Sequence, residues 1–251
     1  MASSNPVFQM LRGAKRRVAS SVAAWQMRRS LRKILPRSPG GSDAWVVFDV
    51  GANVGQTALQ LRRVLRGVAS PTIHCFEPFA DNYAALQANT ARDPSIRTHR
   101  MGMAAAAGTM TVPLSPESQW HSIANQDEWR PRAGTSETIE LTTLDGFAAR
   151  EGIERITILK TDTEGYDLEV LRGGQTLLAS ARIALVICEV GFNPEDRQHT
   201  YFPAVFDHLL GHGYRMCLLD DQMVYRSAAW GDVPSVGYAN AWFVAPRKTS
   251  G

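Results

Sequence analysis

The chain has 251 residues, of which 44% are hydrophobic, which is enough for one well-filled α/β domain and too little for two ordinary domains. The formal net charge of +3 is unevenly distributed along the chain. Residues 1–42 contain nine of the 27 Arg and Lys residues and no Asp or Glu, whereas residues 43–251 contain the other 18 together with all 24 acids. The three cysteines lie in apolar runs and lack metal-ligand spacing, so we expect them to be buried. Their odd number argues against a disulfide framework and favours a reducing cytosol.

The basic segment 1–42 predicts a helical arm in front of a single domain over residues 43–251. Apolar side chains recur at helix-like intervals between the basic ones, at Phe8, Leu11, Val18, Val22 and Trp25. Such a helix would pack on the domain or extend into solvent, or it would lie on an anionic membrane surface. A mitochondrial presequence has a similar composition. The uncharged stretch of residues 18–27 is too short to span a membrane.

Residues 46–59, VVFDVGANVGQTAL, predict a buried strand, a glycine loop and a helix. Gly51 and Gly55 let the backbone approach a ligand, but their spacing is neither that of the dinucleotide fingerprint nor that of the phosphate loop. Asp49, at the end of the strand, would repel a pyrophosphate but accept hydrogen bonds from an ammonium group. Asn53 could cap the helix or bind a ligand carboxylate. The unit therefore predicts a ligand with an amino-acid moiety.

The next predicted strand, residues 72–76, ends at Glu77, which follows Gly51 by 26 residues. In related βαβ folds an acid at about this distance binds a ribose diol. A ribose together with an amino-acid moiety predicts S-adenosylmethionine as the ligand. The alternative is that Asp49 and Glu77 only cap the ends of their strands.

Further along, residues 81–91 predict a helix, and residues 96–101 and 109–114 predict extended segments. The small residues between the two extended segments, with Met103 among them, leave room for the adenine ring. Residues 115–135 predict a long loop for substrate contact, in which His121 is a candidate base.

The predicted strand 156–162 carries Lys160 and Asp162 at its carboxyl end, and Glu164 follows in the turn. Strand alternation places Lys160 and Asp162 on the same side, so they can pair, and a purely structural salt bridge is the alternative. Methyl transfer needs a group that takes up the acceptor's proton. Asp162, Glu164, Lys160 and His121 are the candidates, and Asp162 is also expected to contact the donor.

Two further patterns bear on metals. Glu189, at the end of the predicted strand 184–190, could join Asp162 and Glu164 around Mg²⁺, but acids at a strand edge more often bind hydroxyl groups, so no metal site is expected. His208 and His212 are expected on the surface of the helix 202–210. A strand over residues 214–219 and a last strand over residues 239–245 complete the pattern.

The chain resembles the FkbM family of S-adenosylmethionine-dependent methyltransferases. The resemblance rests on FDVGANVGQTAL, CFEPFADNYAALQAN, IELTTLDGF, ILKTDTEGYDLEVLRGG and VICEVGF, which occur in this order from Phe48 to Phe192. It implies a Rossmann-like class I fold, a three-layer sandwich around a seven-stranded, mostly parallel sheet whose seventh strand is antiparallel. It also implies methylation of a hydroxyl group on a sugar, glycolipid or polyketide-type natural product.

Two rival functions remain. A nucleic-acid methyltransferase could use the basic arm as a phosphate clamp, but the negative domain would repel nucleic acid, and TDTEGYD stands where amino-group methyltransferases carry an Asn/Asp-Pro-Pro-aromatic motif. A non-catalytic cofactor-binding module is the second rival. We expect a cytoplasmic enzyme, in peripheral contact with the inner membrane face if the arm binds lipid, and the sequence leaves the oligomeric state open.

Overall fold

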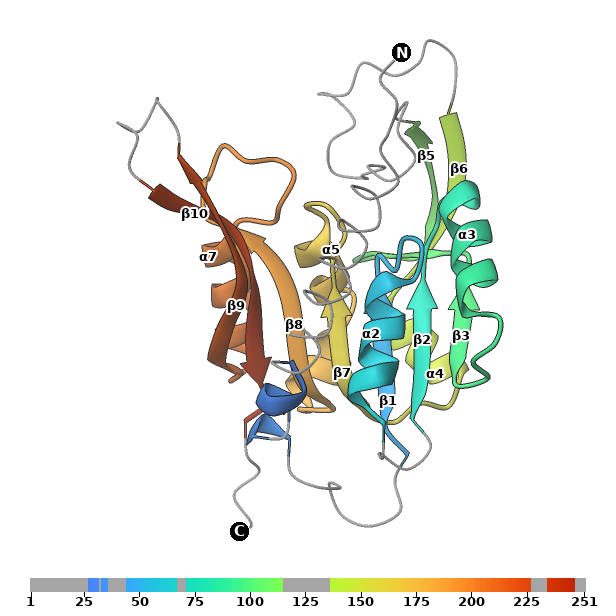
Figure 1. Ribbon diagram of the computed structural model, residues 1–251, viewed down its shortest axis with the longest axis horizontal. Helices are drawn as coiled ribbons and strands as arrows, with labels where there is room; N and C mark the ends of the chain where they lie inside the picture. The colour runs from blue at the N-terminus through green and yellow to red at the C-terminus, as the bar shows by residue number, and fades with distance from the viewer. Residues whose placement is uncertain are drawn as a thin grey trace, which may run out of the picture.

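The structure is a computed structural model that describes residues 27–31, 33–35, 44–66, 71–114, 136–226 and 234–246. Its centre is a seven-stranded sheet in the order β3-β2-β1-β7-β8-β10-β9 (Figure 1). The strands are β1 (Val46–Val50), β2 (Thr72–Phe76), β3 (Ile96–His99), β7 (Ile156–Thr161), β8 (Ile183–Gly191), β9 (Arg215–Arg226) and β10 (Pro234–Val244). The five neighbouring strands β3, β2, β1, β7 and β8 pair in parallel. Strand β10 runs antiparallel to both of its neighbours, β8 and β9. This confirms the predicted sheet and its antiparallel last strand.

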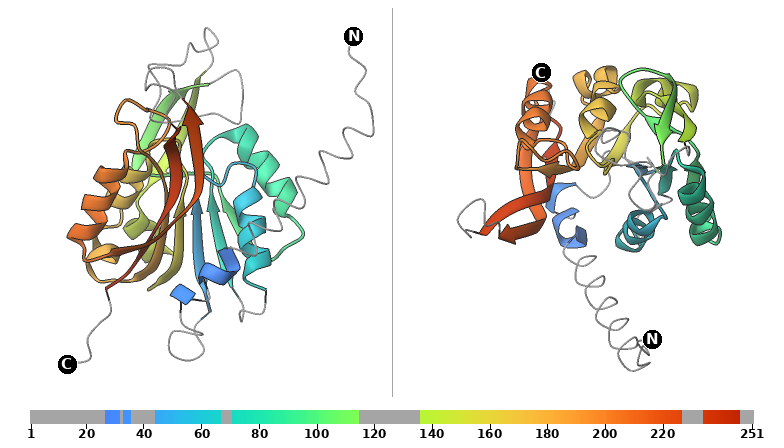
Figure 2. Two further views of the ribbon diagram at one scale, coloured as in Figure 1. Left: turned by 60° about the vertical axis from the view of Figure 1, so that its left-hand side comes forward. Right: turned by 90° about the horizontal axis from the view of Figure 1, so that it is seen from above.

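Helices cover both faces of the sheet, which confirms the three-layer sandwich (Figure 2). The helices are α2 (Gln56–Val64), α3 (Ala80–Thr90), α4 (Leu144–Arg150), α5 (Asp167–Arg172), α6 (Gln175–Ala179) and α7 (Phe202–Gly211). Apolar side chains of α2 and α3 pack in one cluster with Val47, Ile158 and Leu185 of the sheet. Those of α4 to α7 pack on the other face in a second cluster, which includes Phe48 and Leu159. The strands are apolar on both sides because both faces are buried.

A small second sheet stands apart from the first and has the order β4-β6-β5. It consists of β4 (Gly102–Met103), β5 (Gly108–Pro113) and β6 (Ser136–Thr142), and it has an apolar cluster of its own. The predicted extended segment 109–114 is therefore a strand of this sheet rather than of the central one.

Only the end of the predicted arm lies within the described residues. Residues 27–31 are helical, and Leu31 and Leu35 are buried in the cluster of α2 and α3. This part of the arm packs on the domain, and the remaining arm residues, together with His121 and the 115–135 loop, lie outside the described residues. No helix in the described part of the chain is long and apolar enough to cross a membrane.

One prediction about the cysteines is wrong. Cys75 and Cys188 are buried in central strands as expected, but Cys217 is exposed on β9. Strand β9 is at the edge of the sheet, where the apolar run Tyr214–Leu219 is not enclosed on both sides.

The ends of β1 and β7 approach each other closely at Gly51. The amide of Asp162 donates a hydrogen bond to the carbonyl oxygen of Val50 (3.0 Å), and the amides of Gly51 and Ala52 both donate to the carbonyl oxygen of Phe76 (3.0 Å). A Cβ atom at Gly51 would lie 1.9 Å from the carbonyl oxygen of Asp162, and its φ of +80° is left-handed. The glycine that the sequence assigned to ligand approach is thus required by the neighbouring strand.

We expect Gly51→Ala to destabilise the domain much more than Gly152→Ala. Gly152 also has a left-handed φ (+66°), but a Cβ there would meet nothing within 4 Å. The control should therefore lose only the roughly 1–2 kcal/mol of an unfavourable φ, whereas Gly51→Ala adds a backbone clash. Urea unfolding measures both, and equal losses would contradict this account.

Candidate active site

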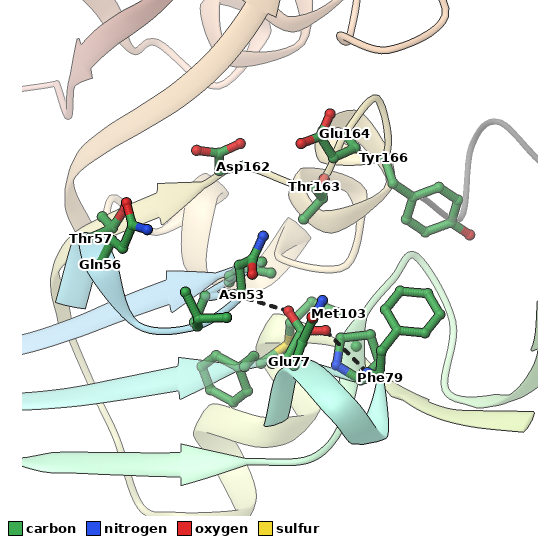
Figure 3. Close-up of a pocket in the computed structure, with 18 residues that line it drawn as sticks. Asn53, Gln56, Thr57, Glu77, Phe79, Met103, Asp162, Thr163, Glu164 and Tyr166 are labelled. Atoms are coloured by element: carbon green, nitrogen blue, oxygen red, sulfur yellow. Dashed lines mark hydrogen bonds between the residues drawn. The ribbon is translucent and has the colours of Figure 1, made fainter. Parts of the chain in front are cut away.

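A cavity of about 320 Å³ opens at the carboxyl ends of β1, β2 and β7 (Figure 3). Its wall is formed by residues 50–54, 56–57, 76–79, 82, 102–103, 162–164 and 166. Six residues that the sequence singled out meet in this wall, namely Gly51, Asn53, Glu77, Met103, Asp162 and Glu164. The volume lies within the range of small-molecule sites, and the carboxyl edge of a parallel sheet is where such folds bind ligands.

Glu77 joins two walls of the cavity. Its carboxylate accepts hydrogen bonds from the amide of Asn53 (3.0 Å) and from the amide of Phe79 (3.1 Å). The side chain is 4% exposed, and burial raises the pKa of Glu77 to about 7, although the two amides act in the opposite direction. Each carboxylate oxygen has a second lone pair, so Glu77 can still accept a hydrogen bond from a ligand hydroxyl.

Asp49 is buried beneath the glycine loop and is not part of the cavity wall. Neither carboxylate oxygen has a side-chain hydrogen-bond partner among the described residues, and burial raises the pKa of Asp49 to about 7 against the opposing effects of Lys160 and the Ala58 backbone. Gly55 does not line the cavity either, because it faces α3, where a Cβ would lie 2.9 Å from Cδ1 of Leu86. Direct ligand contact by Asp49 and Gly55 thus stays a prediction.

The predicted pairing of Lys160 with Asp162 is confirmed. Nζ of Lys160 lies 3.2 Å from Oδ2 of Asp162 and donates a second hydrogen bond to the carbonyl oxygen of Thr161 (2.8 Å). Burial alone would lower the pKa of Lys160, but nearby carboxylates, that of Asp162 first among them, raise it. Lys160 is outside the cavity wall and stays cationic, which argues against its role as a base.

Glu164 and Asp162 form the rim of the cavity beyond β7. Burial and the neighbouring carboxylate of Asp162 raise the pKa of Glu164 to about 7. The side chain of Asp162 is 34% exposed, so its carboxylate is accessible from the cavity even though Lys160 holds it. Their catalytic roles remain predictions.

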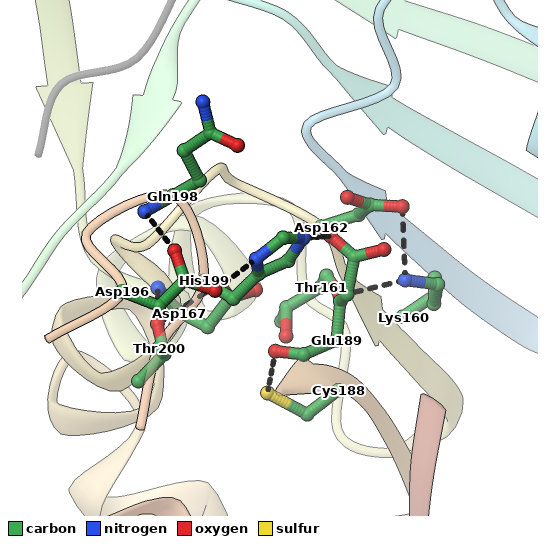
Figure 4. Close-up of polar contacts among 10 residues, drawn as sticks. All are labelled: Lys160, Thr161, Asp162, Asp167, Cys188, Glu189, Asp196, Gln198, His199 and Thr200. Carbon is green, nitrogen blue, oxygen red and sulfur yellow. Dashed lines mark hydrogen bonds and ion pairs between the residues drawn. The ribbon is translucent and has the colours of Figure 1, made fainter. Parts of the chain in front are cut away.

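The structure adds residues that sequence reasoning missed. Asn82 and Tyr166 line the cavity. Glu189, which the sequence placed only in a hypothetical Mg²⁺ site, instead lies near a pair formed by Asp196 and His199 (Figure 4). The one sequence signal for this pair is that residues 192–201 follow the carboxyl end of β8. Within the described part of the chain, no group of three or more His, Cys, Asp or Glu residues is arranged to hold a metal ion.

The strand order, the antiparallel β10 and a cavity beyond β1 and β2 define a class I methyltransferase fold. The family model for the methyltransferase FkbM domain matches residues 49–216 of the sequence, and the chain belongs to this family.

Two curated relatives and one solved structure illustrate the range of the family. The chain is 27% identical over 152 residues to the hexuronic acid methyltransferase AglP of Haloferax volcanii, and the aligned stretch covers 60% of this chain and 59% of AglP. It is 26% identical over 155 residues to the 31-O-demethyl-FK506 methyltransferase FkbM of Streptomyces tacrolimicus, covering 61% and 57% of the two chains. The methyltransferase FkbM structure from Methylobacillus flagellatus KT superposes with a TM-score of 0.51 at 16% identity, covering 84% of this chain and 46% of that one. The chain thus spans less than two thirds of the length of these proteins.

We expect Glu77→Gln to change the pH dependence of stability. The pKa of Glu77 is about 7 in the folded state and near 4.5 when unfolded, so folded wild type binds the proton more tightly and loses stability as pH rises between these values. The glutamine variant lacks this loss. The free energy of unfolding of the variant minus that of wild type should therefore increase by about 3 kcal/mol over this range. Urea titrations at several pH values test this. A difference in unfolding free energy between variant and wild type that does not change with pH would contradict the raised pKa of the buried Glu77.

Proposed function

We propose that the chain is an S-adenosylmethionine-dependent O-methyltransferase that modifies a hydroxyl group on a sugar, a glycolipid or a polyketide-type natural product. The observation that carries the proposal is the position of Glu77, which lies in the cavity wall and is hydrogen-bonded to the loop after β1. Membership of the family supports the same chemistry.

The residues of the cavity fit this donor. Glu77 can accept hydrogen bonds from the ribose hydroxyls, Met103 and the residues near it offer an apolar surface to the adenine, and the loop with Gly51 and Asn53 faces the methionyl part. Asp49, two residues before Gly51, is a buried acid that a ligand cation would stabilise, as Lys160 already does. When bound, S-adenosylmethionine supplies a methyl group on a positively charged sulfur, so the protein has only to align the acceptor and remove its proton.

Asp162 is suited to the acceptor side of the reaction. It lines the cavity, and its ion pair with Lys160 holds the carboxyl group where it can accept a hydrogen bond from the acceptor hydroxyl. The names of the two curated relatives, a hexuronic acid methyltransferase and a 31-O-demethyl-FK506 methyltransferase, support an oxygen-bearing glycan or natural-product acceptor.

Binding of the donor can be divided into its two halves. Asp49→Ala should weaken the binding of S-adenosylmethionine by roughly 10–100-fold, because a hydrogen bond to a charged group contributes about 1.5–3 kcal/mol. It should leave the binding of 5′-methylthioadenosine unchanged, because that ligand lacks the ammonium group. Glu77→Gln should weaken both ligands. Calorimetry measures the affinities, with the exposed Asp207→Ala as control. Unchanged affinity of both variants for S-adenosylmethionine would overturn the proposed donor site.

Methyl transfer needs a separate test. With p-nitrophenyl β-D-glucuronide and p-nitrophenyl β-D-glucoside as acceptors, wild type should add one methyl group to a hydroxyl, as mass spectrometry detects. Asp162→Ala should lower the rate by about 100-fold or more while the donor still binds. Because this change leaves Lys160 without its closest carboxylate, thermal unfolding must verify that the variant is folded at the assay temperature. Full activity in a folded variant would remove Asp162 from the mechanism.

A further inference from the structure

His199 is held in one orientation by two independent contacts. Its Nδ1 atom lies 2.8 Å from Oδ2 of Asp196, and its ring stacks on Tyr238 of β10 with a centroid distance of 4.3 Å and an interplanar angle of 13°. The side chain is 11% exposed. Both contacts leave the Nε2 atom pointing away from Asp196, toward the end of β8 (Figure 4).

The loop that carries His199 is anchored on both sides. The amide of Gly191 donates to the carbonyl oxygen of Thr200 (2.9 Å). The hydroxyl of Thr200 accepts a hydrogen bond from the amide of Asp167 and donates one to the Asp167 carboxylate, both at 3.1 Å. The imidazole is therefore positioned by fixed backbone rather than by a loosely held surface segment.

The Nε2 atom of His199 points at the carboxyl group of Glu189 and is within ion-pair distance of it. It lies 3.9 Å from Oε2 of Glu189, which is too far for a direct hydrogen bond, so a hydroxyl group placed beside the two atoms could bond to both. The register of β7 and β8 pairs Thr161 with Cys188, so Glu189 and Asp162 follow side by side at the carboxyl edge of the sheet. His199 is thus beyond Asp162, on the side of the cavity rim away from β1 and β2.

We propose that His199, oriented by Asp196, is the general base that removes the proton from the methyl acceptor. This inference rests on the proposed methyl transfer. If the donor occupies the cavity at β1, β2 and β7, an acceptor that enters over the adjoining ends of β7 and β8 would meet His199, Glu189 and Asp162. Asp162, paired with Lys160, can position the acceptor hydroxyl, whereas an imidazole whose Nδ1 is fixed by a carboxylate presents Nε2 as a proton acceptor, the arrangement that activates hydroxyl groups in hydrolases.

The step balances in atoms and charge. The O–H bond of the acceptor breaks and its proton goes to Nε2 of His199. A bond forms between the acceptor oxygen and the methyl carbon while the carbon–sulfur bond of the donor breaks, and the electron pair of that bond stays on sulfur. The positive charge of the donor thereby passes to the imidazolium, which Asp196 stabilises until the proton leaves to water.

Charged groups surround the imidazole on every packed side. Asp196 faces it from its own loop, Glu189 from β8 and Tyr238 from β10. Lys160 of β7 and Asp162, the residue that follows this strand, adjoin Glu189, and Glu164 interacts with Asp196. Within this set, Asp196 is the group that lies within hydrogen-bond distance of the imidazole.

Three variants separate a base from a structural contact. His199→Asn places an amide nitrogen where Nδ1 was, so it can keep the bond to Asp196 while removing the base. His199→Ala opens a space that free imidazole can enter. His212→Ala is the control, because His212, at the C-terminal cap of α7, bonds to the His208 carbonyl oxygen and to Gln175 of α6 and does not line the cavity.

We expect His199→Asn and His199→Ala to lower kcat by roughly 100–10,000-fold with the affinity for S-adenosylmethionine unchanged. Added imidazole should restore activity to His199→Ala alone. In the free wild-type protein, ¹⁵N NMR at pH 8 should find His199 with the proton on Nδ1 and a lone pair on Nε2.

Three outcomes would overturn the inference. These are a proton on Nε2 in the NMR experiment, substantial activity in His199→Asn, or a loss in His199→Ala that imidazole does not restore. If wild type binds the donor and methylates an acceptor, any of these removes His199 alone. If wild type neither binds the donor nor transfers a methyl group, the proposed function fails first and the inference falls with it.

Discussion

The site depends on how closely the ends of β1 and β7 approach each other. Their backbones are joined by the hydrogen bond from the Asp162 amide to the Val50 carbonyl oxygen, and the space between Gly51 and Asp162 excludes even a Cβ atom. This contact brings the glycine loop and the acids after β7 around one cavity, although more than 100 residues separate them in sequence. A side chain at Gly51 would separate the two walls, so the glycine is needed for the shape of the site before any ligand is considered.

The second constraint is the burial of charge at the same edge of the sheet. Asp49, Lys160, Asp162 and Glu189 extend from three adjacent strands on the face that α2 covers. Burial makes ionised carboxylates unfavourable, which explains the raised pKa values of Asp49 and Glu189. Lys160 offsets part of this by remaining cationic. Clusters of shifted pKa values are typical of functional sites, because a stable core would avoid them.

The sequence predicted the central part of this site well. The strands ending at Asp49, Glu77 and Asp162 are apolar runs bounded by glycine or an acid, and parallel strands present such ends at one edge, so their convergence followed from pattern alone. The same reasoning failed where the position of a side chain or strand depends on packing against distant parts of the chain. The alternation that places Asp49 near the edge does not reveal that the glycine loop covers it, and the propensity for a strand at 109–114 does not say which sheet it joins.

The sequence by itself determined most strands of the central sheet and the acids that surround the cavity, because these depend on local periodicity and on turns at the ends of strands, and the fold class followed from the resemblance to the FkbM family. Only the tertiary structure decided which of these acids face the cavity and which are buried beneath it. It alone brought together His199, Asp196 and Glu189, because the contact between a loop, a strand end and Tyr238 of a later strand is set by packing between distant segments. No periodic pattern in residues 192–201 records that packing.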